Sequence, residues 1–305
     1  MTLAPKTAAI EVALDPKIDL GVSLEVFRRS GDDLLDRWDG EHLLRTVRIE
    51  GQPVAYLAQT SQASGRATLS VVAEKPKQAA AIADHIGAGF LRRTAAFVQL
   101  CREDPAVERL ARLHSSYRPV LHPDLLVGLI RCISAQQVNL RWAATTRRRL
   151  AEKFGHRHEI GNHFVYSLDA ARLASADPAE IRALQFTTRK AEYIVEVARA
   201  VADGRLEIES LRAASDDEVI ARIVTIRGLG VWTAEWMLAR TLGRPRVSAA
   251  DLGVRKAVGK VYFGGRMPSP DEVRTATAHW GTAATFAQEL LLHAQHLKTL
   301  DAVAA

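Results

Sequence analysis

A short turn, Gly228-Leu229-Gly230, lies between two segments whose apolar residues recur at helical spacing. Asp216 or Asp217 is expected to cap the first segment, because aspartate is favoured at helix N-termini. A glycine turn alone is weak evidence, since any helix can end at glycine. A second helix that begins directly after the turn, however, presents free backbone N–H groups and the positive end of its dipole. The sequence therefore predicts two helices joined by a hairpin, near 217–242, that can bind a phosphate group.

An aspartate, Asp251, stands at the start of a third helical segment, 252–258, which a short loop separates from the hairpin helices. The simplest interpretation is an N-cap, and a helix N-terminus also stabilises the ionised carboxylate. An anionic carboxylate that faces a pocket can stabilise a cationic transition state. The spacing alone favours the cap, and the two roles are compatible because they need the same geometry.

Trp232 and Trp236 lie one turn apart, on one face of the second hairpin helix. Such aromatic pairs are typical of a hydrophobic core. The same rings can also line a pocket in which a flat, electron-poor or cationic base stacks. The spacing of the two residues leaves both interpretations open.

A histidine-rich segment also contains glycine and asparagine, so we expect a loop there. Its ionisable members are His156, His158, Glu159 and His163. Their spacing matches neither a helical i, i+4 pair nor a cysteine-paired zinc motif. The two cysteines, Cys101 and Cys132, are too few for a four-cysteine metal site, an iron–sulfur cluster or a disulfide framework. The sequence therefore predicts no metal-centred mechanism.

The chain carries 41 basic and 35 acidic residues, a formal charge of +6. This excess favours a polyanionic partner, although similar excesses occur on ordinary solvated surfaces. Charged residues interrupt every apolar stretch near the N-terminus, and no long uncharged apolar segment follows. Neither a signal peptide nor a membrane span is predicted. With so few cysteines, we expect a soluble protein of a reducing, intracellular compartment.

Strand-like and helical patterns occupy different parts of the chain. An antiparallel sheet is predicted from three alternating segments, 44–49, 54–58 and 67–72. Beyond Pro76 the apolar spacing becomes helical. One of these helices gives way at Ala135-Gln136-Gln137, before Asn139 caps the next. Strands first and helices afterwards predict an α+β chain whose larger part is mostly helical.

These motifs resemble the helix-hairpin-helix (HhH-GPD) DNA glycosylase superfamily, specifically its AlkA-like 3-methyladenine DNA glycosylase II branch. The run Ile226–Ala234 together with Asp251 carries the most specific part of the resemblance. Segments 126–138 and 184–191 are similar to further parts of that branch, and the sheet-bearing N-terminus is similar to its extra domain. The resemblance covers roughly the whole chain.

The fold that the resemblance implies is α+β. An N-terminal domain, 1–86, contains an antiparallel β-sheet with helices. A larger all-helical core, 87–305, contains the helix-hairpin-helix near 217–242 and forms the glycosylase proper.

Each matched position takes a role from the resemblance. Asp251 matches the catalytic aspartate, which stabilises an oxocarbenium-like sugar and orients or activates water. Gln137 matches the wedge residue that fills the gap left by a flipped nucleotide. The phosphate-binding hairpin comprises Gly228, Leu229 and Gly230, whose backbone carbonyls commonly hold a structural monovalent cation in this family. The family positions that line the base pocket are matched by Trp232, Trp236 and Phe27.

Trp232 also stands where bifunctional relatives carry a lysine that forms a Schiff base. Indole cannot form an imine with C1′ of the sugar, so AP lyase activity is not expected. The resemblance implies no cofactor and no catalytic metal. Ala250 stands where many relatives have another acid, and this departure leaves the substrate range open.

The function implied is that of a monofunctional DNA glycosylase of base excision repair. It flips out alkylated purines of the 3-methyladenine and 7-methylguanine type and hydrolyses their N-glycosidic bond to leave an abasic site. The expected partner is double-stranded DNA with damaged bases, bound by a monomer in the cytoplasm of a bacterium, at the nucleoid, or in the nucleus of a eukaryote. Two alternatives remain. One is a related glycosylase for deaminated or oxidised bases, and the other is a non-catalytic protein that recognises damaged DNA.

Overall fold

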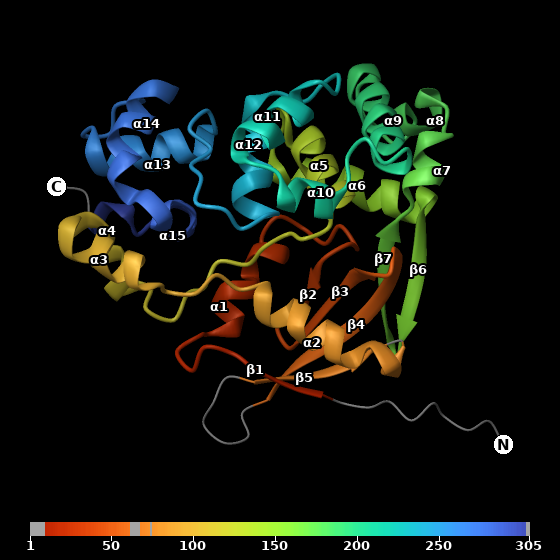
Figure 1. Cartoon of the computed structure of the whole chain (residues 1–305), viewed down its shortest axis with the longest axis horizontal. Helices are drawn as coiled ribbons and strands as arrows, with labels where there is room; N and C mark the ends of the chain where they lie inside the picture. The colour runs from red at the N-terminus through yellow and green to blue at the C-terminus, as the bar shows by residue number, and fades with distance from the viewer. Residues whose placement is uncertain (1–9, 62–67, 74, 303–305) are drawn as a thin grey trace. The chain divides into compact units, whose positions relative to one another are not determined.

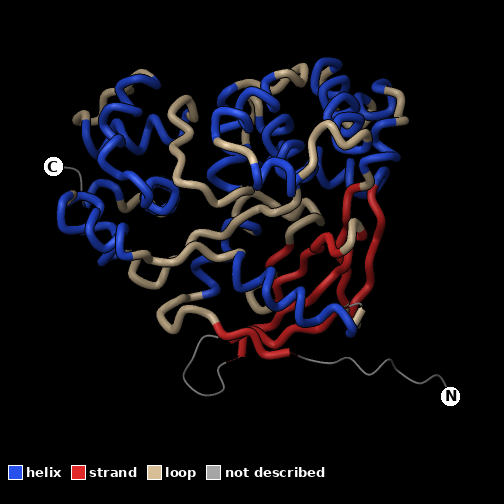
Figure 2. The backbone as a smooth tube through the Cα atoms, viewed as in Figure 1, coloured by secondary structure: helices blue, strands red, loops and turns tan. Residues whose placement is uncertain are grey.

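The computed structural model describes residues 10–61, 68–73 and 75–302 and divides the chain into two compact units (Figure 1). The sheet unit comprises 1–89, 122–213 and 226–228. The helical unit comprises 90–121, 214–225 and 229–305. All strands among the described residues lie in the sheet unit, as the red segments of Figure 2 show.

A five-stranded antiparallel sheet, in the order β1-β5-β4-β3-β2, forms the base of the sheet unit. Its strands are β1 (Ile10–Ala13), β2 (Arg37–Trp38), β3 (His42–Ile49), β4 (Gln52–Ser61) and β5 (Thr68–Ala73). Glu50 and Gly51 join β3 to β4 with φ of 52° and 76°, the left-handed conformation that tight hairpins use. Helix α2 (Ala79–Ala88) packs on β1 and β5. The three predicted strands are confirmed, apart from residue 67, which lies outside the described residues.

A second hairpin, β6 (Gly155–Ile160) and β7 (His163–Leu168), replaces the loop expected around the histidine-rich segment. Gly161, with φ of 58°, supplies the left-handed residue of its two-residue turn. The strands form because Ile160 and Val165 are buried against Leu44 and Ala55 of the large sheet. The all-helical expectation for 87–305 is therefore wrong for this segment, although the rest of the described core is largely helical.

The helices of the sheet unit surround a core to which α5 contributes most of its length. They are α1 (Leu20–Leu24), α5 (Leu125–Ala135), α6 (Leu140–Phe154), α7 (Ala170–Ala174), α8 (Pro178–Arg182), α9 (Thr188–Ala202) and α10 (Ile208–Ala213). Asn139 caps α6 as predicted, because its Oδ1 accepts from the backbone N–H of Trp142 (2.8 Å). Cys132 is buried in α5.

A buried network of charges joins the N-terminal segment to α5 and α6. Its members are Asp33, Asp36, Arg45, Arg131 and Arg147. Arg131 bridges both carboxylates, at 2.7 Å from Asp33 and 2.8 Å from Asp36. Burial by itself would raise the pKa of Asp36, but Arg45 and Arg131 hold it well below its usual range. The predicted boundary after residue 86 thus falls inside α2, and the sheet shares its unit with 122–213.

The helical unit is built from helices around a core that includes Phe97, Phe286 and Leu290. They are α3 (Ala95–Glu103), α4 (Pro105–Leu113), α11 (Asp216–Val224), α12 (Val231–Arg240), α13 (Leu252–Tyr262), α14 (Pro270–Thr277) and α15 (Ala284–His296). Cys101, in α3, is only partly buried. Among the described residues, no helix combines the length and the apolar character needed to cross a bilayer.

The cap of α11 differs from the prediction. Ser215 accepts from the backbone N–H of Glu218, and the Glu218 carboxylate accepts from the backbone N–H of Ser215 (2.7 Å). This reciprocal pair, a capping box, satisfies a backbone N–H at each of its two residues. Asp216 and Asp217 instead occupy the first turn, where their charge is favourable to the helix dipole.

Candidate functional site

Asp251 is the N-cap of α13, as its position in the sequence predicted. Its Oδ1 accepts from the backbone N–H of Val254 (3.0 Å), and its Oδ2 accepts from the indole N–H of Trp232 (3.1 Å). Donors on both oxygens and the positive end of the helix dipole stabilise the negative charge of the carboxylate. Asp251 is only partly buried, so an anionic oxygen is held in a fixed orientation at the protein surface.

Gly253 provides the space that this carboxylate occupies. A side chain at this position would place its Cβ 3.0 Å from Oδ1 of Asp251 and 3.2 Å from Leu292. Both distances are shorter than ordinary van der Waals contact, so a larger residue would displace the carboxylate or the leucine. The sequence analysis had missed this role, although the Asp251-Leu252-Gly253 spacing was visible.

The two tryptophans of α12 occupy different environments. Trp232 is partly buried and bonds to Asp251, so it positions the carboxylate. Trp236 is 7% exposed, and the guanidinium of Arg240 lies 5.4 Å from its ring centroid. Burial would lower the pKa of Arg240, but Glu289 and Asp251 raise it. The structure thus brings Trp232 and Asp251 together in the helical unit, with Trp236 one turn along the same helix.

The hairpin turn needs glycine for two independent reasons. Gly228 has a φ of 92°, which other residues rarely adopt. A Cβ at this position would lie 2.2 Å from the ring of Tyr193, on α9. The carbonyl oxygen of Gly228 accepts from the side-chain amide of Gln136 (3.2 Å). Within the sheet unit, Gly228 is therefore held closely against α9 and the end of α5.

The helix that follows the turn has no side-chain cap. Gly230 is the N-cap residue of α12, and Val231, the first residue of the helix, is 47% exposed. Its first backbone N–H groups consequently remain available, and the helix dipole directs positive potential outward at this point. Arg227 adds a cation whose side chain is 70% exposed and which pairs with Glu192 (2.9 Å). This arrangement can bind a phosphate.

Gln137, the predicted wedge residue, lies at the exposed corner between α5 and α6. Its φ of 54° is unusual for a residue other than glycine and turns the chain sharply at this point. Val138 and Leu140 beside it are 37% and 57% exposed, which gives the corner an apolar surface. Glutamine at the tip and apolar neighbours are suited to insertion between bases.

Lys190 supports this corner from α9. Its ammonium group donates to the carbonyl oxygens of Ser134 (2.9 Å) and Gln136 (2.7 Å), two acceptors that the end of α5 leaves free. Burial lowers the pKa of Lys190. The sequence analysis had missed Gln136, Lys190 and Tyr193 as supports, since their contacts join segments that are far apart in the chain.

Phe27 belongs to the sheet unit and is 6% exposed. Its ring packs edge-on against His122, with centroids 5.5 Å apart, and the guanidinium of Arg45 lies 4.9 Å from its centroid. Phe27 therefore lies in the core of the sheet unit, beside the buried charge network. A role for Phe27 in a base pocket stays a prediction.

Comparisons with known proteins agree with this geometry. The sequence model of the family described as "HhH-GPD superfamily base excision DNA repair protein" matches residues 130–282, half of the chain. The Bacillus subtilis protein YfjP is 30% identical over 175 residues, which are 57% of this chain and 60% of that protein. A DNA-3-methyladenine glycosylase of the same organism is 28% identical over 186 residues, which are 60% and 61% of the two chains. The match thus spans about three fifths of the length of these curated relatives.

Solved structures show the same fold. A 3-methyladenine DNA glycosylase from Archaeoglobus fulgidus superposes with a TM-score of 0.80 at 23% identity, over 93% of this chain and 96% of that one. A Clostridium acetobutylicum 8-oxoguanine glycosylase/lyase in complex with double-stranded DNA gives a TM-score of 0.73 at 14% identity, over 96% and 97%. The family match includes the C-terminal half of α5, the hairpin and Asp251. The chain belongs to the HhH-GPD superfamily of base excision DNA repair proteins.

Proposed function

We propose that this protein is a monofunctional DNA glycosylase that hydrolyses the N-glycosidic bond of alkylated purines. The observation that carries the proposal is the Asp251 carboxylate, fixed by the N-terminus of α13 and by the indole N–H of Trp232. A protein that only binds damaged DNA has no need of an oriented, partly exposed carboxylate next to its phosphate-binding helix.

The chemistry requires little more than this carboxylate. Alkylation at N3 or N7 gives a purine a positive charge, which weakens the glycosidic bond and makes the base a good leaving group. Positive charge then develops on the sugar as the bond breaks, and an anion nearby stabilises it. Asp251 supplies that anion and can orient the water that attacks C1′. The released base needs no strong general acid.

The absence of lyase activity is part of the proposal. A Schiff base at C1′ requires an amine nucleophile, and Trp232 stands where the bifunctional relatives have theirs. Its indole nitrogen has no available lone pair, and its N–H is engaged with Asp251. Borohydride should therefore trap no covalent protein–DNA adduct. An adduct formed by the parent protein would contradict this part of the proposal alone.

Double-stranded DNA is the proposed partner, bound by a monomer wherever the cell keeps its DNA. The uncapped N-terminus of α12 and the Arg227 cation would hold a backbone phosphate. Gln137 would enter the space that the flipped nucleotide leaves, since it lies exposed at a corner fixed by Lys190. A monovalent cation at the hairpin would have to share the Gly228 carbonyl with Gln136, which the two lone pairs of a carbonyl oxygen permit.

The test is base release from methylated DNA, identified by mass spectrometry. The parent should release 3-methyladenine and 7-methylguanine. Asp251→Asn should lose about a hundredfold or more of this activity, because it removes the charge but keeps a good capping residue. DNA affinity should remain near that of the parent.

Asp177→Asn is the matched control, since Asp177 caps α8 with an exposed side chain and should tolerate the same change. Undiminished base release by Asp251→Asn would refute the catalytic assignment. If the protein released only oxidised or deaminated bases, from DNA that carries such damage, its substrates would be those bases rather than alkylated purines.

A further inference from the structure

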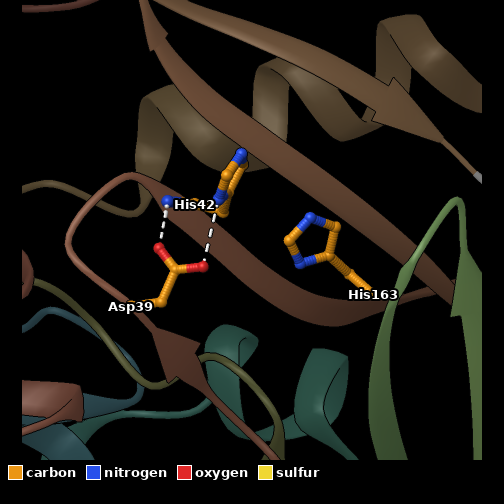
Figure 3. Close-up of side chains that lie close together, drawn as sticks. All are labelled: Asp39, His42 and His163. Carbon is orange, nitrogen blue, oxygen red and sulfur yellow. Dashed lines mark hydrogen bonds and ion pairs between the residues drawn. The ribbon is translucent and has the colours of Figure 1, made fainter.

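Two neighbouring side chains at the start of β3 meet a third from β7, more than a hundred positions away in the sequence (Figure 3). Asp39 lies in the loop before β3, His42 is the first residue of β3, and His163 is the first residue of β7. One potential ligand atom from each lies within 4.8 Å of the other two. Two imidazoles and a carboxylate form a donor set typical of sites for divalent transition metals.

Asp39 is held in place by the backbone around it. Its Oδ1 accepts from the backbone N–H groups of Glu41 (2.8 Å) and His42 (2.7 Å). Its Oδ2 is thereby directed at Nδ1 of His42, 3.0 Å away, as the dashed lines in Figure 3 show. Two ligands bound to one zinc ion at the tetrahedral angle are about 3.4 Å apart. This pair consequently needs almost no movement to share an ion.

His163 completes the set from the other hairpin. Its ring centroid lies 4.5 Å from that of His42, and the rings are inclined at 46° rather than stacked. Among the described residues, no hydrogen bond orients the His163 imidazole. Because all three ligand atoms lie within 4.8 Å of one another, that of His163 needs to approach by at most about 1.4 Å to reach tetrahedral spacing, which a rotation of the side chain can provide.

We propose that Asp39, His42 and His163 form a binding site for Zn²⁺ or a similar late first-row divalent cation. Water completes the coordination, because the site is partly exposed: 48% of the Asp39 side chain and 19% of the His42 side chain are accessible. Binding through Nδ1 of His42 requires the tautomer with its proton on Nε2, so the contact between Nδ1 and the Asp39 carboxylate is replaced by bonds of both groups to the ion.

The ion acts as a cross-link rather than in the glycosylase reaction. It joins the start of β3 to the start of β7, strands that already contact each other. Arg37 already links the N-terminal segment to β7 by donating to the carbonyl of Phe164 (2.6 Å), and Leu44 of β3 packs with Val165 of β7. A bond between positions that far apart in the sequence closes a long loop, so the ion should stabilise the folded sheet unit.

The experiment uses the full chain without an affinity tag, stripped of metal by a chelator that is then removed. Calorimetric titration with Zn²⁺ should show one site, and thermal unfolding should shift upward by about 5 °C at a hundredfold excess over Kd. His163→Ala should weaken zinc binding at least tenfold and abolish the shift. Mg²⁺, which prefers oxygen ligands, should have little effect on either protein.

His156→Ala is the matched control, because His156 lies on the same hairpin and bonds a carboxylate, Asp169, without a second imidazole. It should bind zinc like the parent. His42→Gln is the second variant and should lose binding as His163→Ala does, while its unfolding temperature without metal shows that it folds. Failure of the parent to bind zinc, or equal binding by His163→Ala and His156→Ala, would overturn the proposal.

Discussion

Trp232 has one feature that the sequence suggests and one that only the structure shows. By resemblance it matches the position of the lysine of bifunctional relatives, and in the structure it donates a hydrogen bond to Asp251. A hydrogen bond to a charged acceptor fixes the orientation of that acceptor as well as stabilising it. The indole N–H is a neutral donor, so this bond orients the carboxylate without cancelling its charge.

Replacement of Trp232 by phenylalanine tests this bond. Trp232→Phe keeps an aromatic ring but removes the N–H, so kcat for base release should fall about tenfold, consistent with ~1.4 kcal/mol for one such bond. DNA affinity should change little. In the Asp251→Asn background the same substitution should have no further effect, because the two residues act as a pair. Additive losses in this double-mutant cycle would show that Trp232 contributes by some other route.

The sequence predicted correctly that Asp251 caps a helix, because an N-cap depends on the residues that immediately follow it. The side chain that donates a hydrogen bond to Asp251 could not be predicted in this way. Trp232 appeared as a pocket or core aromatic, and its bond to Asp251 exists only because α12 and α13 are packed with a particular orientation. Phe27 shows the same limitation, since its contacts to His122 and Arg45 come from distant segments.

The hairpin turn is an element in which conformation and packing can be tested separately. Gly228→Ala should reduce DNA affinity and lower the free energy of unfolding by about 2 kcal/mol or more, because it adds a clash with Tyr193 to an unfavourable φ. Gly161→Ala is the matched control. Gly161 also has positive φ, but no atom lies within 4 Å of a Cβ placed there.

The control should therefore lose only about 1 kcal/mol and keep its DNA affinity. Fluorescence anisotropy with a labelled duplex and urea unfolding measure the two quantities. Equal effects of the two substitutions on stability and binding would mean that the contact with Tyr193 has no separate importance.

The ends of helices and strands could be predicted from the sequence where the contacts that fix them join residues close together in the chain. The strands of the β3–β4 hairpin and the Asn139 cap were predicted correctly. The β6–β7 hairpin was not, because its strands are stabilised by burial against β3 and β4, more than 100 positions away in the pair Leu44 and Val165. For α11, two adjacent aspartates concealed the better capping pair formed by Ser215 and Glu218.

Acid should destabilise the whole molecule through groups buried in the sheet unit. Burial lowers the pKa of His85 and of His122 to about 4, whereas an unfolded histidine has a pKa of about 6.5. The unfolded chain therefore binds more protons than the folded one in this range, and stability falls as the pH drops from about 6.5 to about 4. The pKa values of Asp33 and Asp36 are also lowered, so their contribution is lost only at still lower pH.

Urea unfolding between pH 7 and pH 4 measures this dependence. His122→Gln should reduce the slope by up to about 1.4 kcal/mol per pH unit, because one proton fewer is taken up on unfolding. A profile that stays flat in the parent would contradict the lowered pKa values of the buried histidines.

The division of the molecule into units differs from the division of its sequence patterns. The pattern changes from strands to helices near residue 76, and the N-terminal domain expected from the resemblance ends at residue 86. The compact sheet unit instead combines the N-terminal strands with α5 to α10, through a charge network that includes Asp33 and Arg131. These ion pairs join residues about a hundred positions apart in the sequence. A change from strand-like to helical spacing therefore does not mark the edge of a packed core.

The sequence by itself determined the family, the α+β class, the glycine hairpin and the position of Asp251 as a helix N-cap. Each depends on residues close together in the chain, where backbone conformation and capping are set by neighbours. Only the tertiary structure decided that Trp232 orients Asp251, that Lys190 supports the wedge corner, and that His163 meets Asp39 and His42 rather than His156 and His158. These contacts join distant segments, and burial and packing select them among the many that local preference permits.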